Sequence, residues 1–313
     1  MELKEIAKNV MTSCLAVKAG EALLVVTDDS RVEIGRAIYE GAKDLGCEAM
    51  LLVMEERKMS GEEPPKIVAE AMKAADVVIC PTAQSLTHTH ARMEAAKAGA
   101  RIATMPGITK TMFHTGAMTA DYGEVEKLSL KIAALLTDAS TATVEKGGKR
   151  LILDLKGRTG LASTGIYREP GKGGNLPSGE AYIAPKESGS NGEMDIDGSM
   201  VGLGKLEAPL HVTIQNGKLQ SISGEKSEFL DVLLQNEHNA TLCELGIGTN
   251  RAAILNGAIL EDEKVYGTVH IAFGTNDSFG GTNKADCHMD GIILKPTLYL
   301  DDQLVIQEGV FAV

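Results

Sequence analysis

The amino-terminal half of the chain alternates between short apolar runs and segments in which apolar residues recur at helical spacing. The apolar runs lie at 22–27 (ALLVVT), 48–54, 76–81 (DVVICP) and 101–106 (RIATMP). Helical spacing occurs at 2–17, 32–45, 65–74, 87–98 and 121–137. Continuous apolar runs are typical of strands buried on both faces, and strands that alternate with helices form right-handed βαβ units. The pattern therefore predicts a parallel sheet, with residues 141–145 as its fifth strand.

The pattern changes near Gly147 and Gly148, beyond which glycines, short strands and turns dominate. Strand-like runs lie at 150–156, 192–204, 240–248 and 266–273, a helix is expected at 225–235, and hairpins are expected at 210–223 and 299–308. The pair Asn216-Gly217 in the first hairpin is a strong signal for a two-residue turn. We therefore expect an α/β parallel-sheet, Rossmann-like domain at residues 1–147 and an α+β domain with a mixed or antiparallel sheet at 148–313.

The composition excludes several classes of partner. Of the 313 residues, 43% are hydrophobic and 24% are charged, which is typical of a soluble globular protein. The net charge of −12 argues against nucleic acid or an anionic membrane as the partner. No signal peptide and no apolar run of about 18 residues is visible, so a cytoplasmic location is expected. The five cysteines show no paired spacing and are expected to be structural.

The segment 269–294 carries the clearest candidate chemistry. It consists of a strand-like run with His270, a loop rich in Gly, Asn and Ser at 274–283, and a second run with His288 and Asp290 two residues apart. Residues i and i+2 of a strand share a face, so His288 and Asp290 should project side by side, and His270 joins them if the two strands pair. Two imidazoles and one carboxylate are the ligand set of an open divalent-metal site, which we place in the carboxyl-terminal domain.

Two glutamates extend this candidate site. Glu244 lies within the apolar run ATLCELGIG, and a carboxylate there is costly unless it is paired or binds a metal. Glu180 ends the loop GKGGNLPSGE and begins a short strand. Together with the two histidines and the aspartate, these glutamates exceed the ligands that one ion needs. They fit a pair of ions bridged by carboxylates.

Two further histidines follow the third predicted strand, in the loop SLTHTHAR. No Gly-x-Gly-x-x-Gly follows the first strand, where the acidic turn TDDSRVEIG would repel a pyrophosphate. His88 and His90 instead lie at the carboxyl end of a parallel strand, where ligands bind in open α/β sheets. At a helix start their spacing puts them on different faces, so we expect at most one to reach a site. The alternative is that both are surface histidines.

Four motifs, NLPSGE, CELGIGTN, GTVHIAFG and HMDG, resemble the metallo-aminopeptidases of the aminopeptidase T and aminopeptidase S type, over most of the chain. The resemblance implies a dinuclear site of Zn, Co or Mn held by Glu180, Glu244, His270, His288 and Asp290. Where that family has a tyrosine ligand, this chain has Asp277, seven residues after His270. The main expectation is a hydrolase that releases amino-terminal residues from peptides through a metal-activated water, with a glutamate that is free of the metal as general base.

The same motifs also resemble the related 2,5-dihydroxypyridine dioxygenases, which cleave an aromatic ring. This alternative implies one Fe(II) held by His270, His288 and Asp290, with open positions for O₂ and a bidentate substrate. Glu180 and Glu244 would then surround the ligands, and His88 or His90 would be the acid or base. In both interpretations the partner is a small molecule or a short peptide. Glycine-rich loops shield such a site poorly, so we expect a homo-oligomer built from dimers.

Overall fold

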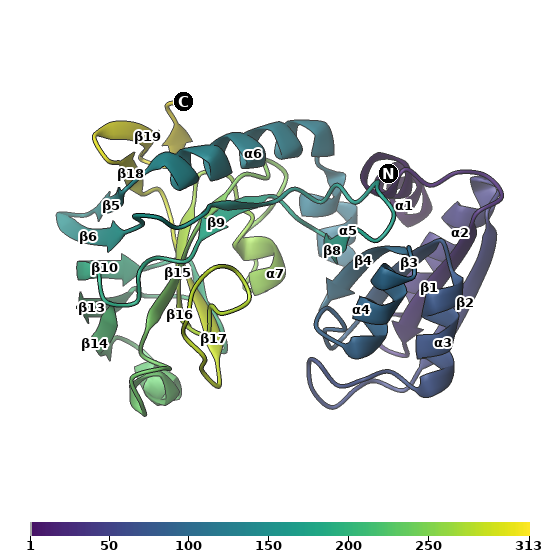
Figure 1. Cartoon of the computed structure of the whole chain (residues 1–313), viewed down its shortest axis with the longest axis horizontal. Helices are drawn as coiled ribbons and strands as arrows, with labels where there is room; N and C mark the ends of the chain where they lie inside the picture. Colours follow the sequence, from purple (N-terminus) through teal and green to yellow (C-terminus); the bar gives the residue numbers. More distant parts are fainter. Residues whose placement is uncertain (1) are drawn as a thin grey trace. The chain divides into compact units, whose positions relative to one another are not determined.

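The computed structural model describes residues 2–313, which form two compact units (Figure 1). Unit 1 comprises the chain up to Glu126 together with Thr164–Ser178, and unit 2 comprises Lys127–Ser163 and Gly179–Val313. Unit 1 is built on a parallel sheet, whereas every strand pair in unit 2 is antiparallel. The predicted fold class, an α/β part followed by an antiparallel part, is confirmed.

Unit 1 contains the predicted alternation of strands and helices. Its sheet has the order β2-β1-β3-β4-β8, with β1 at Ala22–Asp28, β2 at Glu48–Met54, β3 at Val77–Thr82, β4 at Arg101–Pro106 and β8 at Gly173–Asn175. Its helices are α1 (Leu3–Leu15), α2 (Val32–Asp44), α3 (Lys66–Ala74), α4 (His90–Lys97), α5 (Lys110–His114) and the 3₁₀ turn η1 (Ala117–Thr119). Helices pack on both faces of β1 and β3, which explains why these strands are apolar almost throughout.

The predicted fifth parallel strand is wrong. The segment predicted at 141–145 forms β5 (Thr141–Lys146), which pairs antiparallel with β6 (Lys149–Asp154) in unit 2. Gly147 and Gly148, with φ of +57° and +82°, form the two-residue turn between them, and such a turn fixes an antiparallel pairing. The expected domain boundary at 147/148 therefore falls inside unit 2, because this glycine pair is the turn of a hairpin within one sheet. The fifth parallel strand is β8, which pairs with β4 from much later in the chain.

Unit 2 contains two antiparallel sheets. The eight-stranded sheet has the order β14-β13-β10-β6-β5-β18-β19-β20, adding β10 (Asn191–Ile196), β13 (Leu210–Gln215), β14 (Lys218–Ser223), β18 (Thr297–Leu300), β19 (Gln303–Gln307) and β20 (Val310–Phe311). The seven-stranded sheet has the order β12-β11-β17-β16-β15-β9-β7, with β7 (Leu161–Ser163), β9 (Glu180–Ile183), β11 (Ser199–Met200), β12 (Gly204–Lys205), β15 (Leu242–Gly248), β16 (Val269–Gly274) and β17 (His288–Ile293). The helical elements are α6 (Tyr122–Asp138), which begins in unit 1, η2 (Ser227–Leu234) and α7 (Ile259–Asp262).

Both predicted hairpins are present. In the β13–β14 hairpin, Asn216 and Gly217 occupy the two turn positions with φ of +50° and +72°, as the expected turn type requires. The closing hairpin joins β18 to β19 through Asp301 and Asp302. The helix predicted at 225–235 is the 3₁₀ segment η2.

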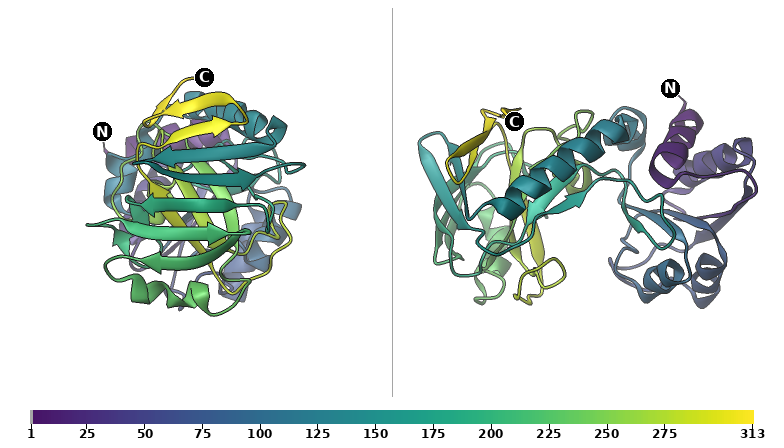
Figure 2. Two further views of the ribbon diagram at one scale, coloured as in Figure 1. Left: turned by 90° about the vertical axis from the view of Figure 1, so that its left-hand side faces the viewer. Right: turned by 45° about the horizontal axis from the view of Figure 1, so that its top comes forward.

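The core of unit 2 lies between its two sheets (Figure 2). In the left view the strands of the eight-stranded sheet cross in front of the more steeply inclined strands of the other. Leu245 and Ile247 of β15 and Ile271 of β16 are fully buried in this core, beside Leu153 and Val212 of the facing sheet. Because side chains alternate along a strand, Glu244 and His270 lie on the opposite face of the seven-stranded sheet.

The ion pair of a buried arginine in unit 1 gives a test of the structure. Arg101, with 7% of its side chain exposed, lies 2.6 Å from Glu21 and donates to the Leu15 and Ala16 carbonyls at 2.6 and 3.0 Å. We expect Arg101→Met to lower the free energy of unfolding of unit 1 by about 3 kcal/mol, because it leaves buried acceptors without a partner.

The matched control is Lys97→Met, which breaks the exposed ion pair with Glu94. Such a pair contributes about 0–1 kcal/mol, so the control should hardly change the unfolding curve. Urea unfolding followed by circular dichroism measures both variants, and equal effects would contradict the role of Arg101.

Candidate metal centre

Four neighbouring strands of the seven-stranded sheet bring together all five predicted ligand residues. Glu180 begins β9, Glu244 lies in β15 and His270 in β16, and β17 carries His288 and Asp290. The predicted pairing of the two runs around the loop is observed: β16 and β17 are antiparallel, with Asp290 opposite Ala272 and His288 opposite Gly274. Because side chains alternate along a strand, these five side chains project from one face of the sheet, and their neighbours in the chain project from the other face into the core.

Small residues across the strands provide the space for these side chains. His270 lies opposite Gly246, Glu180 opposite Gly248, and Glu244 opposite Ala272. A Cβ atom on Gly246 would lie 1.9 Å from Nε2 of His270, so no other residue fits there without displacing the imidazole. The sequence CELGIG thus supplies both a carboxylate and the room for the ring beside it.

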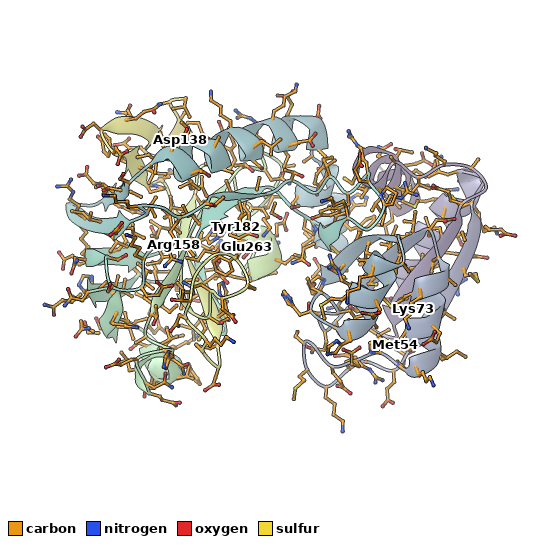
Figure 3. The ribbon with its side chains drawn as sticks, viewed as in Figure 1. Met54, Lys73, Asp138, Arg158, Tyr182 and Glu263 are labelled. Carbon is orange, nitrogen blue, oxygen red and sulfur yellow. The ribbon has the colours of Figure 1, made fainter. Side chains whose placement is uncertain are left out.

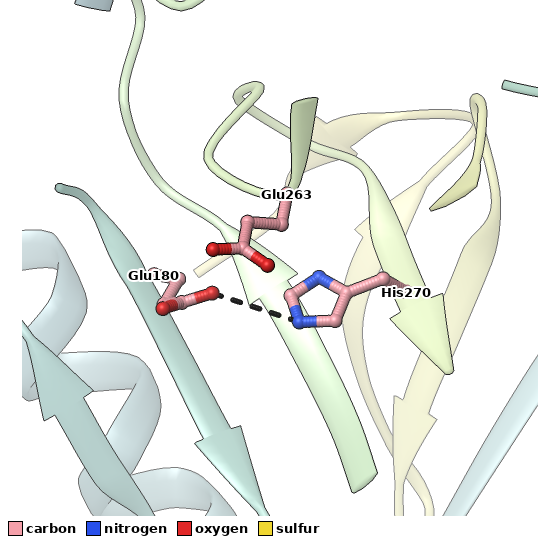
Figure 4. A group of neighbouring side chains, drawn as sticks. All are labelled: Glu180, Glu263 and His270. Carbon is pink, nitrogen blue, oxygen red and sulfur yellow. Dashed lines mark ion pairs between the residues drawn. The ribbon is translucent and has the colours of Figure 1, made fainter. Parts of the chain in front are cut away.

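The distances between the polar atoms match those around a metal ion. Nε2 of His270 lies 3.4 Å from Oε1 of Glu244 and 3.6 Å from Oε2 of Glu180 (Figure 4). Nε2 of His288 lies 3.4 Å from both Oε2 of Glu244 and Oδ1 of Asp290. Two ligand atoms that each lie about 2.1 Å from one ion are separated by roughly 3–3.5 Å. These spacings therefore suit shared coordination better than direct hydrogen bonding.

A backbone contact fixes the protonation of His288. Its Nδ1 lies 2.9 Å from the carbonyl oxygen of Thr275, and because a carbonyl can only accept, Nδ1 carries the hydrogen. In the neutral ring the lone pair is then on Nε2, which faces Glu244 and Asp290. Cys243 Sγ lies 3.7 Å from the same Nδ1, a neighbour that the sequence did not indicate. Burial raises the pKa of the Cys243 thiol to about 11, so it stays protonated.

His270 is fully buried, and neither of its ring nitrogens makes a hydrogen bond within residues 2–313. Burial lowers the pKa of this imidazole, but the carboxylates of Glu244, Glu180 and Asp290 outweigh burial and raise it to about 9. Burial raises the pKa of Asp290, yet His288 and His270 outweigh it and lower it to about 2. The cluster therefore attracts positive charge, and a buried imidazole without a hydrogen-bond partner fits a metal ligand.

Two residues join the cluster although no sequence pattern indicated them. Glu263 and Lys264 directly follow α7, in the polar run EDEK, which has the appearance of a solvated surface. Lys264 is nevertheless 1% exposed, and its Nζ lies 2.7 Å from Oε1 of Glu180 and also contacts Oε1 of Glu263. Although burial lowers the pKa of this amine, Glu180 and Glu263 outweigh burial and raise it above its ordinary value. Burial raises the pKa of Glu263, whereas the ammonium group of Lys264 lowers it.

Within the described residues, two sets of three side chains have the compactness that a metal ion requires. One set is Glu180, Glu263 and His270, and the other is Glu244, His288 and Asp290, with the ligand atoms of each set within 4.8 Å of one another. Glu244 links the sets, because its two oxygens face the two imidazoles. Figure 3 labels Glu263 in this region of unit 2.

The remaining candidates lie outside both sets. His88 and His90 are exposed residues of unit 1 at the start of α4, where the His90 amide donates to Glu63 at 2.5 Å. Asp277 is exposed in the loop after β16 and lies 3.7 Å from Lys284. Asp277 belongs to neither set. It therefore does not take the place of the tyrosine ligand that the resemblance to the aminopeptidases implied at this position.

Aromatic rings border the cluster on one side. Phe279, from the loop between β16 and β17, meets the edge of His288 with ring centroids 5.9 Å apart. It also meets Tyr182 of β9 at 5.6 Å, again edge to face. Asn276 holds this loop, since its Oδ1 accepts from the amide of Asn283 at 2.8 Å, and Arg158, labelled in Figure 3, donates to the Gly280 carbonyl. Two aromatic side chains therefore lie next to one of the candidate ligands.

The fold and this cluster define a class: two-unit α/β proteins in which an antiparallel sheet presents imidazoles and carboxylates suited to a divalent metal. The 2,5-dihydroxypyridine 5,6-dioxygenase family matches residues 2–313, and the chain belongs to this family. The enzyme of that name from Pseudomonas putida KT2440 is 24% identical over 259 residues, which span 76% of this chain and 71% of the relative.

Solved structures show the same fold. The 2,5-dihydroxypyridine dioxygenase of Pseudomonas putida KT2440 superposes with a TM-score of 0.81 at 19% identity, covering 99% of this chain and 97% of that one. Wild-type AmpT from Thermus thermophilus superposes with a TM-score of 0.73 at 16% identity, covering 99% of both chains. Both expected resemblances are thus confirmed, and the family match favours the dioxygenase interpretation over the aminopeptidase one. No helix in the range 2–313 has the length and apolar character of a membrane span.

Proposed function

We propose that this protein is a metal-dependent ring-cleaving dioxygenase that acts on a hydroxylated pyridine such as 2,5-dihydroxypyridine. The observation that carries the proposal is the family match along residues 2–313, which includes every strand of the imidazole and carboxylate cluster. The substrate assignment rests on the names of the family and of the Pseudomonas putida relative. A dioxygenase places both atoms of O₂ in the product and consumes no external reductant.

The ligand set that this function implies for one Fe(II) ion is His270, His288 and Asp290. His288 and Asp290 belong to one compact set with Glu244, and Nε2 of His270 faces the other oxygen of the same glutamate. Neither ring nitrogen of the buried His270 makes a hydrogen bond within residues 2–313, which also fits a ligand. Bound there, iron(II) would supply open positions for O₂ and for a bidentate substrate. The protein fixes the ring of His288 through the Thr275 carbonyl, and the room for His270 depends on Gly246.

Glu244 is placed to handle protons in this site. Its two oxygens lie 3.4 Å from the Nε2 atoms of both imidazoles, and the side chain is buried. Burial raises the pKa of Glu244, but His270 and His288 outweigh burial and hold it below its ordinary value, so the group is a carboxylate at neutral pH. We propose that Glu244 accepts the proton of a substrate hydroxyl as the substrate binds.

An oxygen electrode tests the proposed function. Protein purified anaerobically and loaded with Fe(II) should consume one O₂ for each 2,5-dihydroxypyridine, and the absorption of the aromatic ring should disappear. Catechol, which lacks the ring nitrogen, serves as the comparison substrate. An Fe-loaded protein that binds 2,5-dihydroxypyridine without O₂ uptake would contradict the proposal.

A metallo-aminopeptidase is the second candidate. It is favoured by the carboxylate of Glu244 between two imidazoles, which is the arrangement of a bridging ligand in two-metal sites, and by the fold shared with AmpT. Hydrolysis of leucine amide by protein loaded with Zn²⁺, Co²⁺ or Mn²⁺ would support it. A small-molecule substrate and dimer-based assembly remain predictions, and light scattering tests the latter.

We expect Phe279→Ala to raise KM for 2,5-dihydroxypyridine about three- to tenfold. The reason is that Phe279 packs edge to face with both His288 and Tyr182 beside the cluster, and such aromatic contacts contribute about 0.5–1.5 kcal/mol. Steady-state kinetics by O₂ uptake measure the change. The matched control is Phe229→Ala in η2, where the ring is 68% exposed. An unchanged KM in the Phe279 variant would exclude this ring from substrate binding.

A further inference from the structure

We propose that the Lys264 ammonium group occupies a second cation position in the cluster and thereby restricts the site to one metal ion. This inference rests on the proposed function only for the location of that ion, which is bound by His288, Asp290 and His270. Lys264 would act as a positioning residue, since it contacts the carboxylates around the site rather than the proposed ligands of the ion.

The position of Lys264 Nζ carries the argument. Glu180, Glu263 and His270 form a set with the spacing of metal ligands, and Nζ contacts the carboxylates of two of its three members. The Nζ–Oε1 distance to Glu180 is 2.7 Å, a short charge-assisted hydrogen bond. A cation therefore already lies between the two carboxylates that a second metal ion would need as ligands.

Burial makes this arrangement hard to displace. Lys264 is 1% exposed and the side chain of Glu180 is 10% exposed, so an ammonium group that left the carboxylates would remain buried without a counter-ion. An approaching divalent ion would also be repelled by the ammonium charge at short range in a medium of low dielectric constant. Ammonium and a second metal ion are thus mutually exclusive at this position.

The consequence concerns the class of reaction. Two-metal hydrolases hold their ions roughly 3.5–4 Å apart, bridged by carboxylates. Lys264 contacts Glu180 and Glu263, so His270 is the third member of their set and the one without a lysine contact. Its Nε2 faces Glu244, which belongs to the set of His288 and Asp290. Lys264 thus decides whether the site binds two metal ions or one ion with open positions.

Metal stoichiometry tests the inference without any measurement of activity. The metal-free full-length chain is dialysed to equilibrium against excess Zn²⁺ and, separately, Mn²⁺, and bound metal is counted by elemental analysis and native mass spectrometry. We expect one ion per chain in the wild type and two in Lys264→Met. Lys264→Arg keeps the charge and should bind one. Lys149→Met, which removes a lysine paired with Asp195 in the other sheet, should also bind one.

Two outcomes would overturn the inference: two ions in the wild type, or one ion in Lys264→Met. If Lys264→Met does not fold without metal, Zn²⁺ should restore its thermal transition, because the ion replaces the lost charge. Failure of Zn²⁺ to do so would equally overturn the inference. A wild type with one ion but no O₂ uptake would refute the proposed function and leave the role of Lys264 standing.

Discussion

Replacing Asp290 by alanine is expected to reduce the bound metal from one ion per chain to nearly none, and O₂ uptake to background. Asp290 is buried and lies 3.4 Å from Nε2 of His288, and the two imidazoles lower its pKa to about 2 against the effect of burial, which keeps it ionised. His288→Ala should have the same effect, since it removes the nitrogen that faces both Asp290 and Glu244. Loss of one of three ligands weakens metal binding by several orders of magnitude in typical sites.

Elemental analysis after dialysis against a low concentration of Fe(II) measures this result. The matched control is Asp277→Ala, which removes an exposed carboxylate from the loop between β16 and β17 and should leave the occupancy at one ion. Circular dichroism should show the wild-type spectrum for all three variants, because the core on the other face of the sheet is untouched. Full occupancy in Asp290→Ala or His288→Ala would refute the ligand assignment.

Replacing Gly246 by alanine should be almost as damaging, although it adds only one methyl group. The new Cβ would lie 1.9 Å from Nε2 and 2.1 Å from Cε1 of His270, which is fully buried. We expect metal affinity to fall at least about 100-fold, because His270 must rotate away from Glu244. We also expect a destabilisation of about 1–3 kcal/mol from overpacking.

A matched alanine substitution distinguishes this steric effect from a general loss of glycine. Gly123 lies at the start of α6, where a Cβ would meet only Asp121 Oδ1, at 3.2 Å. Gly123→Ala should therefore keep its metal and its thermal midpoint. Isothermal titration with Zn²⁺ compares the two variants, and wild-type affinity in Gly246→Ala would show that His270 is not a ligand.

The candidate ligands could be found from the sequence because they violate the local pattern. Glu244 and His270 interrupt apolar strands, and a charged or titratable group in such a run needs a partner. The spacing of His288 and Asp290 gives a common face directly, since the strand period is two. The structure brings these four together with Glu180 as the pattern indicated. The choice between the two families did not follow from these residues, because both interpretations use them.

Glu263 and Lys264 could not be found in the same way. They lie in a short connection between α7 and β16, where no periodicity applies, and EDEK is typical of an exposed turn. Their burial arises only because this connection folds over the face of the sheet that carries Glu180. His88 and His90 show the converse: the sequence offered them as a possible acid or base, but both are exposed and neither belongs to a ligand-like cluster among residues 2–313.

The sequence by itself determined most of the elements, the order of a parallel part followed by an antiparallel part, and the faces on which the polar side chains of the strands lie, because these depend on the spacing of neighbouring residues. Tertiary structure alone decided which strand completes each sheet: β5 joins β6 and β18, and β8 joins β4. Tertiary structure also placed a lysine between Glu180 and Glu263. Pairings between distant segments depend on the packing of the whole chain, and no local pattern encodes them.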